Sequence, residues 1–306
     1  MMAELGEDTA AMRCGIVSVL GAPNAGKSTL VNRLVGAKVT IVSPKVQTTR
    51  TRVRGIAIQD RVQVIYTDTP GIFAPKRRLD RAMVDAAWGG AADADVIAVI
   101  VDAKRGIDGD VERIIAGLEM HRNPTALVLN KVDGLRREVL LTLSHTLNEV
   151  ASFDRTFMIS ALNGSGVKDL EYWFMGLMPA GPWLFRDDEI SDLPQRLFAA
   201  EVTREKAYIK LHQELPYSLL VETESWEEFD NGSVRIEQNL TVARKTQKGI
   251  VLGKGGQMIK RIRAEAQQEL AEILDRPVHL FVRVRVRENW ADDPGHFRDW
   301  GLRFDA

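Results

Sequence analysis

Five short, almost continuously apolar runs recur across the first 177 residues, and stretches of helical character separate most of them. The runs are rich in Val, Ile and Leu and cover residues 16–20, 62–67, 96–101, 125–130 and 156–159. Such runs are typical of strands buried on both faces of a mostly parallel sheet. Helical stretches at 79–88, 109–120 and 135–150 lie between them. The alternation predicts a doubly wound α/β domain, with 53–59 as an additional strand, antiparallel at one edge.

The alternation stops after Leu177, and a chain of 306 residues is long enough for a second domain. Proline and glycine at 179–182 and an acidic stretch at 187–192 indicate a connecting segment. A helical pattern at 197–211 follows, with Pro194 in its first turn. We therefore expect a flexible N-terminus at 1–13, a first domain at 14–178, a linker at 179–194, a second domain at 195–290 and a C-terminal tail at 291–306.

The second half follows a different pattern, which predicts an α+β domain. Strands are expected at 218–224 and 233–243, joined by a turn around Asn231-Gly232. Residues 258–274 have the periodicity of an amphipathic helix. In the last strand, 278–287, aliphatic side chains alternate with His279, Phe281, Arg283, Arg285 and Arg287.

Composition limits where the chain works and how it can bind nucleic acid. The formal net charge is −1, so nucleic acid would need a local cluster of basic residues. The single cysteine, Cys14, cannot form an internal disulfide, which indicates a reducing compartment. We expect its side chain to be buried. The five histidines are scattered and predict no metal site made of side chains alone. No apolar run approaches the roughly 20 residues of a membrane span, and no signal peptide is recognisable, so we expect a cytoplasmic protein.

Residues 21–28 match the pattern G-x-x-x-x-G-K-[ST] between a strand and a helix, which predicts a phosphate-binding loop. Glycines let the main-chain N–H groups surround phosphates, and the helix N-terminus adds partial positive charge. Lys27 would contact the β- and γ-phosphates, and Ser28 would bind Mg²⁺. The expected contacts are Gly21, Ala22, Pro23, Asn24, Ala25, Gly26, Lys27, Ser28 and Thr29.

Three further motifs in order predict that the nucleotide is GTP. Asp68, Thr69, Pro70 and Gly71 close the strand 62–67, where Asp68 would hold Mg²⁺ through water and Gly71 would bind the γ-phosphate. Asp133 would accept two hydrogen bonds that guanine offers and adenine does not. The other expected contacts at this end of the nucleotide are Asn130, Lys131, Ser160, Ala161 and Leu162.

The segment 47–50 lies where a switch loop is expected, and a threonine there would complete the Mg²⁺ site only with the γ-phosphate present. We favour Thr49 over Thr48. Ile72 occupies the position where Ras-like enzymes carry a water-orienting Gln, so hydrolysis is slow or depends on another group. We expect Asn24 to help hold K⁺ against the phosphates. The residues assigned to hydrolysis are Lys27, Thr49, Asn24 and Gly71.

A G-x-x-G loop at 253–256 lies between two helices and predicts a single-stranded RNA site of the KH type. Residues 241–263 contain seven basic side chains and no acidic one. The element order helix–strand–strand–helix–loop–helix–strand is that of a type II KH domain. The expected RNA contacts are Gly253, Lys254, Gly255, Gly256, Lys248, Lys260 and Arg261. Whether the three arginines of strand 278–287 join them or form a solvated face stays open, whereas Trp226 and Trp290 are interpreted as packing residues.

Taken together, these motifs resemble the Era family of bacterial GTPases, which carry a C-terminal type II KH domain. Segments 214–218 and 290–293, with the KH loop, point to this family rather than to other GTPases. The resemblance implies an Era-type GTPase domain, binding near the 3′ end of 16S rRNA, a role in maturation of the 30S subunit, loose association with the inner membrane and a monomer. The tail 299–306 contains no motif that we associate with the family.

Two alternatives remain at this stage. The first is an RNA-binding module whose nucleotide merely stabilises the fold. The second is a metabolic P-loop kinase, which the guanine-specific motif disfavours.

Overall fold

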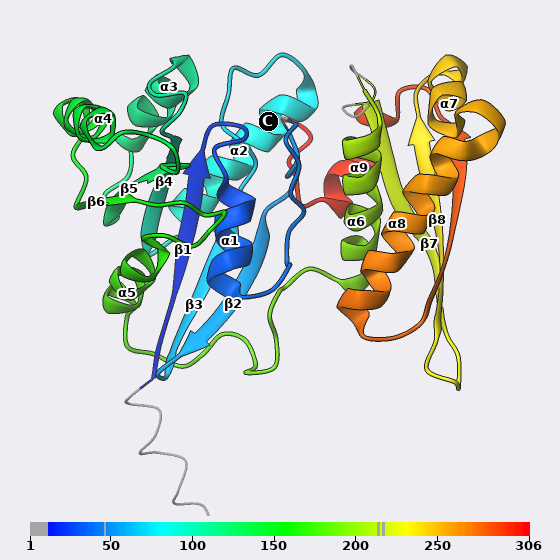
Figure 1. The fold of residues 1–306 in the computed structure, drawn as a ribbon, viewed down its shortest axis with the longest axis horizontal. Coiled ribbons are helices and arrows are strands. Elements are labelled where there is room, and N and C mark those ends of the chain that lie inside the picture. Colours follow the sequence, from blue (N-terminus) through cyan, green and yellow to red (C-terminus); the bar gives the residue numbers. More distant parts are fainter. Residues whose placement is uncertain (1–11, 46, 213–214, 216–217) are drawn as a thin grey trace, which may run out of the picture. The chain divides into compact units, whose positions relative to one another are not determined.

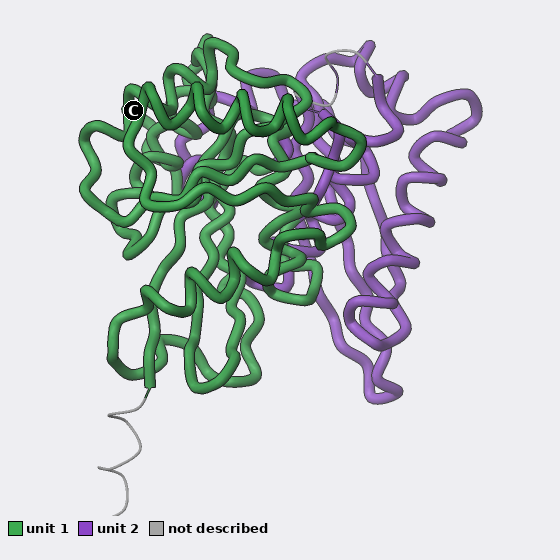
Figure 2. Tube along the Cα trace, turned by 60° about the vertical axis from the view of Figure 1, so that its left-hand side comes forward, with its two compact units in different colours: residues 1–40, 49–192, 301–306 green, residues 41–48, 193–300 purple. Residues whose placement is uncertain are grey.

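The computed structural model describes residues 12–45, 47–212, 215 and 218–306, and the chain divides into two compact units (Figure 2). Unit 1 comprises residues 1–40, 49–192 and 301–306, and unit 2 comprises residues 41–48 and 193–300. The chain therefore passes between the units more than once. The short segment 41–48, which overlaps the expected switch loop 47–50 at its last two residues, belongs to unit 2.

Unit 1 is built on a six-stranded sheet in the order β2-β3-β1-β4-β5-β6 (Figure 1). Every neighbouring pair is parallel except β2 and β3, which are antiparallel. The predicted α/β class and the antiparallel edge strand are confirmed. The strands are β1 (Arg13–Gly21), β2 (Val53–Gln59), β3 (Val62–Asp68), β4 (Val96–Asp102), β5 (Thr125–Asn130) and β6 (Arg155–Met158).

Helices cover both faces of this sheet, as near-continuous burial of its strands requires. One apolar core contains side chains of α1 and α5, and the other contains side chains of α2, α3 and α4. Strands β3, β4 and β5 are buried along their whole length. The helices are α1 (Lys27–Val35), α2 (Arg78–Ala92), α3 (Gly109–Leu118), α4 (Arg137–Val150) and α5 (Val167–Leu177).

The stretch that the sequence suggests as a linker is hydrogen-bonded to unit 1 over much of its length. The Oε1 atom of Gln63 accepts the N–H groups of Leu184 and Phe185 at 2.9 and 3.0 Å. Further along, the Ile56 N–H donates to the Ile190 carbonyl at 2.9 Å. Because β2 is an edge strand, its free main-chain groups need such a partner. Residues 190–192 thus pair with the edge strand β2, and Leu184 and Phe185 are held by β3.

Unit 2 has the element order predicted for a type II KH domain. Its sheet has the order β7-β8-β9, with β7 and β8 antiparallel and β8 and β9 parallel. Side chains of α6 and α8 pack on one face of it. The elements are α6 (Gln195–Lys210), β7 (Leu219–Glu228), β8 (Val234–Val242), α7 (Lys245–Leu252), η3 (Lys254–Gly256), α8 (Gln257–Leu274) and β9 (Val278–Val286).

The residues after β9, of which 291–306 were expected as a C-terminal tail, are structured. A 3-10 turn, η4 (Trp290–Asp292), and α9 (Pro294–Asp299) follow, with Trp290 and Phe297 buried in unit 2. Residues 301–306 belong to unit 1, where the Arg78 guanidinium lies 4.3 Å from the centre of the Phe304 ring. The contact with Phe304 holds this end of the chain. A segment of six residues is too short to show a hydrophobic period, so the sequence did not predict this packing.

Among the residues that the structure describes, no helix has both the length and the apolar character that a membrane span requires. Cys14 is buried as expected, and burial raises the pKa of its thiol.

Candidate functional site

The phosphate loop connects the end of β1 to the start of α1, and its backbone geometry demands particular residues. Asn24 and Gly26 have φ values of 64° and 100°, in the left-handed region. A Cβ at position 26 would lie 2.2 Å from Nδ2 of Asn130. Only glycine fits there, because both the conformation and the space exclude a side chain.

Lys27 is buried at the first position of α1, and its ammonium group lies against the loop. Its Nζ donates to the carbonyls of Gly21 and Ala22, both at 3.0 Å. Burial lowers the pKa of Lys27 to about 8, and the charge of Asp68 opposes that shift. An anionic ligand would raise this pKa again, because it favours the protonated form. The loop therefore places the Lys27 ammonium group beside the main-chain N–H groups, where it could contact a phosphate.

Three hydroxyl groups converge on the carboxylate of Asp68 at the end of β3. Its Oδ2 atom accepts Ser28 Oγ at 2.7 Å, Thr40 Oγ1 at 2.9 Å and Thr49 Oγ1 at 3.0 Å. Its Oδ1 atom is buried and has no hydrogen-bond partner among the described residues. Burial raises the pKa of this carboxyl, whereas Lys27 and the three hydroxyls lower it. An orphaned carboxylate oxygen amid hydroxyls is a donor set suited to a hard divalent cation such as Mg²⁺.

The two candidate threonines differ in surroundings. Thr49 Oγ1 also lies 3.0 Å from Ser28 Oγ, whereas Thr48 Oγ1 donates to the Lys45 carbonyl at 2.8 Å within unit 2. The geometry thus favours Thr49 for a metal-binding role. Sequence reasoning missed Thr40, whose only signal is a hydroxyl residue in the loop after α1.

The segment after β3 is tied to the phosphate loop by its main chain. The Ile72 N–H donates to the Gly21 carbonyl at 3.1 Å, and Thr69 Oγ1 donates to the Val19 carbonyl at 2.7 Å. A Cβ on Gly71 would lie 2.9 Å from the ring of Pro23. Ile72 is fully buried in the core. Its side chain therefore cannot orient a water molecule, in agreement with the absence of a glutamine there.

Asn130 and Lys131 fasten the phosphate loop from the end of β5. Asn130 Nδ2 donates to the Ala25 carbonyl at 2.8 Å, and its Oδ1 accepts the Ala161 N–H at 2.9 Å. Lys131 Nζ contacts the Asn24 carbonyl and the Asp102 carboxylate, both at 2.6 Å. These two residues therefore connect the phosphate end of the site to its predicted base end.

Asp133 presents an ionised, accessible carboxylate at the predicted base end. Ser160 Oγ donates to its Oδ1 at 2.8 Å, and Lys104 Nζ lies 3.0 Å from its Oδ2. The hydrogen bond from Ser160, followed by that from Lys104, lowers the pKa of this carboxyl. Lys104 was not predicted, because a lysine after a buried strand carries no specific signal. Arg33 Nε holds the neighbouring loop through the Ala161 carbonyl at 2.6 Å, whereas the side chain of Leu162 is exposed.

The predicted RNA loop lies in unit 2 and depends on glycine. Gly253, Gly255 and Gly256 have φ values of 70°, 58° and 75°. A Cβ on Gly253 would lie 2.7 Å from the Cβ of Met258. The loop thus brings the main chain to the surface between α7 and α8, with the exposed Lys254 at its tip.

Basic residues of unit 2 fall into two groups. Lys248, Lys254, Lys260 and Arg261 have no ion-pair partner among the described residues. Others are paired with carboxylates: Lys206, Lys210, Arg235, Arg276, Arg283, Arg285 and Arg287. This pairing supports a solvated face for Arg283 and Arg285 of β9 and for Arg287, which follows that strand. Uncompensated positive charge therefore gathers around the loop 253–256. Trp290 is buried and Trp226 packs against the core, as expected of packing residues.

Two protein-family models match the chain. A model described as "50S ribosome-binding GTPase" matches residues 16–131, and a model described as "KH domain" matches residues 214–291. The KH match lies within unit 2, and the GTPase match lies in unit 1 apart from residues 41–48.

Relatives cover nearly the whole chain. GTPase Era of Sinorhizobium medicae is 60% identical over 302 residues, covering 97% of this chain and 97% of the relative. GTPase Era of Rhizobium meliloti is 58% identical over 308 residues, covering 99% and 98%. A crystal structure of Era with MgGDPNP and nucleotides 1506–1542 of 16S ribosomal RNA has a TM-score of 0.90 and 38% identity, covering 95% of this chain and 99% of that one. A phosphate-loop fold and a KH fold in a chain so similar to these relatives identify it as a member of the Era family of GTPases.

Proposed function

We propose that the chain uses GTP binding and hydrolysis to control its grip on the 3′ region of 16S rRNA during assembly of the 30S subunit. Support for the RNA comes from the similar Era structure, which is described as bound to 16S nucleotides. Support from this chain comes from the free cations around Lys254. The observation that carries the switching proposal is the place of segment 41–48 in unit 2.

That segment is flanked by the two threonines that contact Asp68. Thr40 and Thr49 belong to unit 1 and donate to the same Asp68 oxygen. The residues between them are held by α6 of unit 2. The Val42 N–H donates to Glu205 Oε1 at 2.7 Å, and the ammonium group of Lys45 donates to the carbonyls of Tyr208 and Leu211. If Thr40 or Thr49 moves, the segment 41–48 between them would move as well, and with it the hydrogen bonds to α6.

Buried polar side chains of α6 complete this attachment. Arg204 is 1% exposed, and its guanidinium donates to the Thr48 carbonyl. Glu205 is 3% exposed. Burying a charged group is costly unless it is paired, so these residues favour the state in which the segment is bound. The equilibrium of the segment would respond to the γ-phosphate as an order–disorder transition does.

The residues of the nucleotide site would divide the chemistry as follows. Ser28, Thr49 and Asp68 would hold Mg²⁺, with Thr40 beside them, and the ion would neutralise phosphate charge. Lys27 would contact the β- and γ-phosphates, and the Gly71 N–H would bind the γ-phosphate. Asp133 would select guanine. These groups position and stabilise charge, which is the main catalytic contribution in phosphoryl transfer.

Because Ile72 is buried, we infer that another group assists hydrolysis, and that Asn24 helps hold K⁺ at the phosphates. The support is the left-handed conformation of Asn24 and its partly exposed position in the phosphate loop. GTPase rates measured at equal ionic strength in K⁺ and Na⁺ should be higher in K⁺. Equal rates, or an unchanged ratio in Asn24→Ala, would rule out this role.

The resemblance to Era also underlies our proposal of a cytoplasmic monomer that associates peripherally with the inner membrane. Sedimentation of the purified chain and fractionation of cells test these two points separately.

Capture of RNA tests the proposed partner. Cross-linking in cells, followed by sequencing of the bound RNA, should enrich the 3′ region of 16S rRNA. Lys254→Asp should lose this enrichment, and Arg285→Ala, which removes an arginine already paired with Glu224, should retain it. Enrichment of unrelated RNA by the wild-type chain would contradict the proposal.

A further inference from the structure

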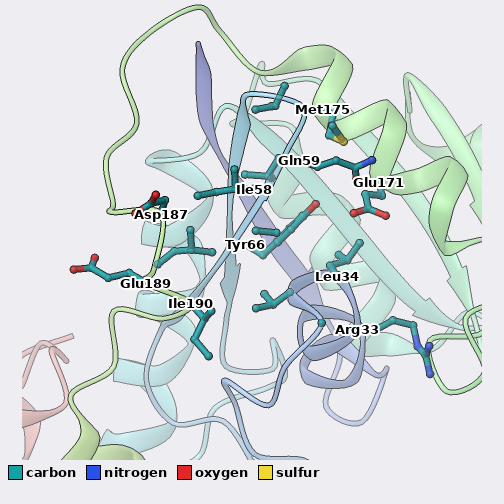
Figure 3. A pocket seen from close by; sticks show the side chains of 16 residues that line it. Arg33, Leu34, Ile58, Gln59, Tyr66, Glu171, Met175, Asp187, Glu189 and Ile190 are labelled. Carbon is teal, nitrogen blue, oxygen red and sulfur yellow. The ribbon is translucent and has the colours of Figure 1, made fainter. Parts of the chain in front are cut away.

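Unit 1 contains a cavity of about 450 Å³ that belongs neither to the nucleotide site nor to the RNA loop. It lies between the last turn of α1, strands β2 and β3, helix α5 and the segment 187–190 (Figure 3). Its walls include aliphatic side chains from four of these elements: Leu34, Ile58, Met175 and Ile190. A volume of this size is within the range of small-molecule sites.

Tyr66 supplies the first sign that this cavity binds a polar ligand. The residue is fully buried on β3, yet its hydroxyl has no hydrogen-bond partner among the described residues. Figure 3 shows the hydroxyl pointing toward the side of the cavity that carries Gln59 and Glu171. Leaving a buried hydroxyl without a hydrogen bond destabilises the folded state. If this position served only to pack the core, phenylalanine would be more stable there than tyrosine. The hydroxyl therefore indicates a hydrogen-bond partner outside the chain.

Carboxylates that form no ion pair with a described residue supply the second sign. Glu171 and Asp187 line the cavity from α5 and from the segment after it, and neither forms an ion pair or side-chain hydrogen bond with a described residue. Burial raises the pKa of the Glu171 carboxyl, and Lys168 opposes this only in part. The one arginine of the lining, Arg33, directs its guanidinium to the carbonyls of Ala161 and Leu162. The cavity therefore has acidic groups and no free cation.

We propose that this cavity is a binding site for an aliphatic diamine or polyamine. One ammonium group would lie between the Tyr66 hydroxyl and Glu171, and a second would face Asp187. The methylene chain would cover the apolar wall between them, where Figure 3 shows Ile58 between Asp187 and Glu171. A neutral or anionic ligand would leave the carboxylates unpaired, and a bare metal ion would leave the apolar walls exposed to water.

A ligand in this cavity would lie next to two segments: the loop that neighbours the predicted guanine contact, and the segment that leads into the RNA-binding unit 2. Arg33 on its wall holds the loop of Ala161, which neighbours the predicted base contact Asp133 through Ser160. On the opposite wall, Ile190 accepts a hydrogen bond from β2 at 2.9 Å, three residues before unit 2 begins. A bound amine would brace the segment 187–190 against the end of α1.

Binding of 1,5-diaminopentane to the full-length, RNA-free chain tests the proposal. Isothermal titration calorimetry at fixed salt and Mg²⁺ should give saturable 1:1 binding, with n-pentylamine weaker and 1,5-pentanediol not binding. Glu171→Gln and Tyr66→Phe should each weaken binding by about tenfold, as expected for loss of a hydrogen bond involving a charged group. Glu112→Gln, an exposed acid on α3, should leave the affinity unchanged.

Thermal unfolding separates a ligand site from a structural role of the same residues. Without amine, Tyr66→Phe should unfold at the same or a higher temperature than wild type and bind GDP equally well. With amine, only wild type and Glu112→Gln should be stabilised. Absence of saturable binding, equal binding of the diol, equal loss in Glu112→Gln, or destabilisation by Tyr66→Phe alone would overturn the proposal, and none of these outcomes bears on the nucleotide site.

Discussion

The proposed nucleotide site of unit 1 and the proposed RNA loop of unit 2 would both attract phosphate, but in opposite ways. Lys27 is buried and held by two carbonyls, and the loop around it is fastened by Asn130 and Lys131. Lys254 is exposed and unpaired on a loop of three left-handed glycines. A preorganised, desolvated site gives strong and specific binding, whereas exposed charges give binding that salt weakens. The difference suits a permanent nucleotide site and a releasable RNA.

The largest effect that follows from this contrast is expected at Lys27. Lys27→Ala removes the one buried cation of the phosphate loop and should weaken GTP and GDP binding by about 3–5 kcal/mol, because the charged group is desolvated. Titration with a fluorescent GDP analogue measures the loss. Without nucleotide, the variant should unfold at the same temperature as the wild type or higher. A loss of nucleotide affinity of less than tenfold would show that Lys27 is less buried in solution.

A smaller loss, confined to the base, is expected at Asp133. Asp133→Asn should weaken GTP binding by roughly 100-fold and shift preference toward xanthosine triphosphate, because the amide matches the donors and acceptors of xanthine. Competition between the two nucleotides gives the ratio directly. Retained selectivity for GTP would refute the role of this carboxylate.

The RNA loop should respond less strongly and in a salt-dependent manner. Replacing Lys254 and Gly255 by Asp should weaken RNA binding by about tenfold at low salt, through negative charge and strain at a positive φ. The slope of affinity against salt should also become shallower. The GTPase rate without RNA should persist, and its collapse would show that the loop supports the fold. Arg285→Ala is the matched control, because that arginine is already paired.

The smallest predicted effect concerns pH. Lys27 has a pKa near 8 in the folded, unliganded chain, below its unfolded value of 10.5. Nucleotide phosphates would raise it again, so binding takes up a proton above pH 8, and affinity should fall by at most about tenfold per pH unit there. Below pH 8 the curve should be flat. By the same linkage, stability without nucleotide should rise between pH 8 and 10.5, because the unfolded chain binds more protons. A flat affinity profile between pH 8 and 10 would contradict the burial of Lys27.

Much of the fold could be predicted because each unit has a periodic signal. Continuous apolar runs marked the strands of unit 1, and alternation marked β9. Spacing also located the nucleotide motifs, since residues such as Lys27 and Asp133 follow strand ends. Thr40 and Lys104 escaped prediction because they reach the site through side-chain geometry, which no spacing encodes.

Other features depend on tertiary contacts that sequence does not reveal. The pairing of 190–192 with β2 arises because an edge strand needs a partner, and the packing of 301–306 on unit 1 depends on Arg78 meeting Phe304. The attachment of 41–48 to α6 likewise rests on buried Arg204 and Glu205, which in sequence look like a solvated helix face.

RNA affinity in the two nucleotide states tests the link between the sites most directly. At matched salt, the wild-type chain should bind a 16S 3′ fragment with different affinities when loaded with a GTP analogue and with GDP. Lys45→Met, which releases the segment 41–48 from the end of α6, should bring the ratio toward one, whereas Lys76→Met on the exposed surface should not. Identical affinities in the two states of the wild type would contradict the coupling.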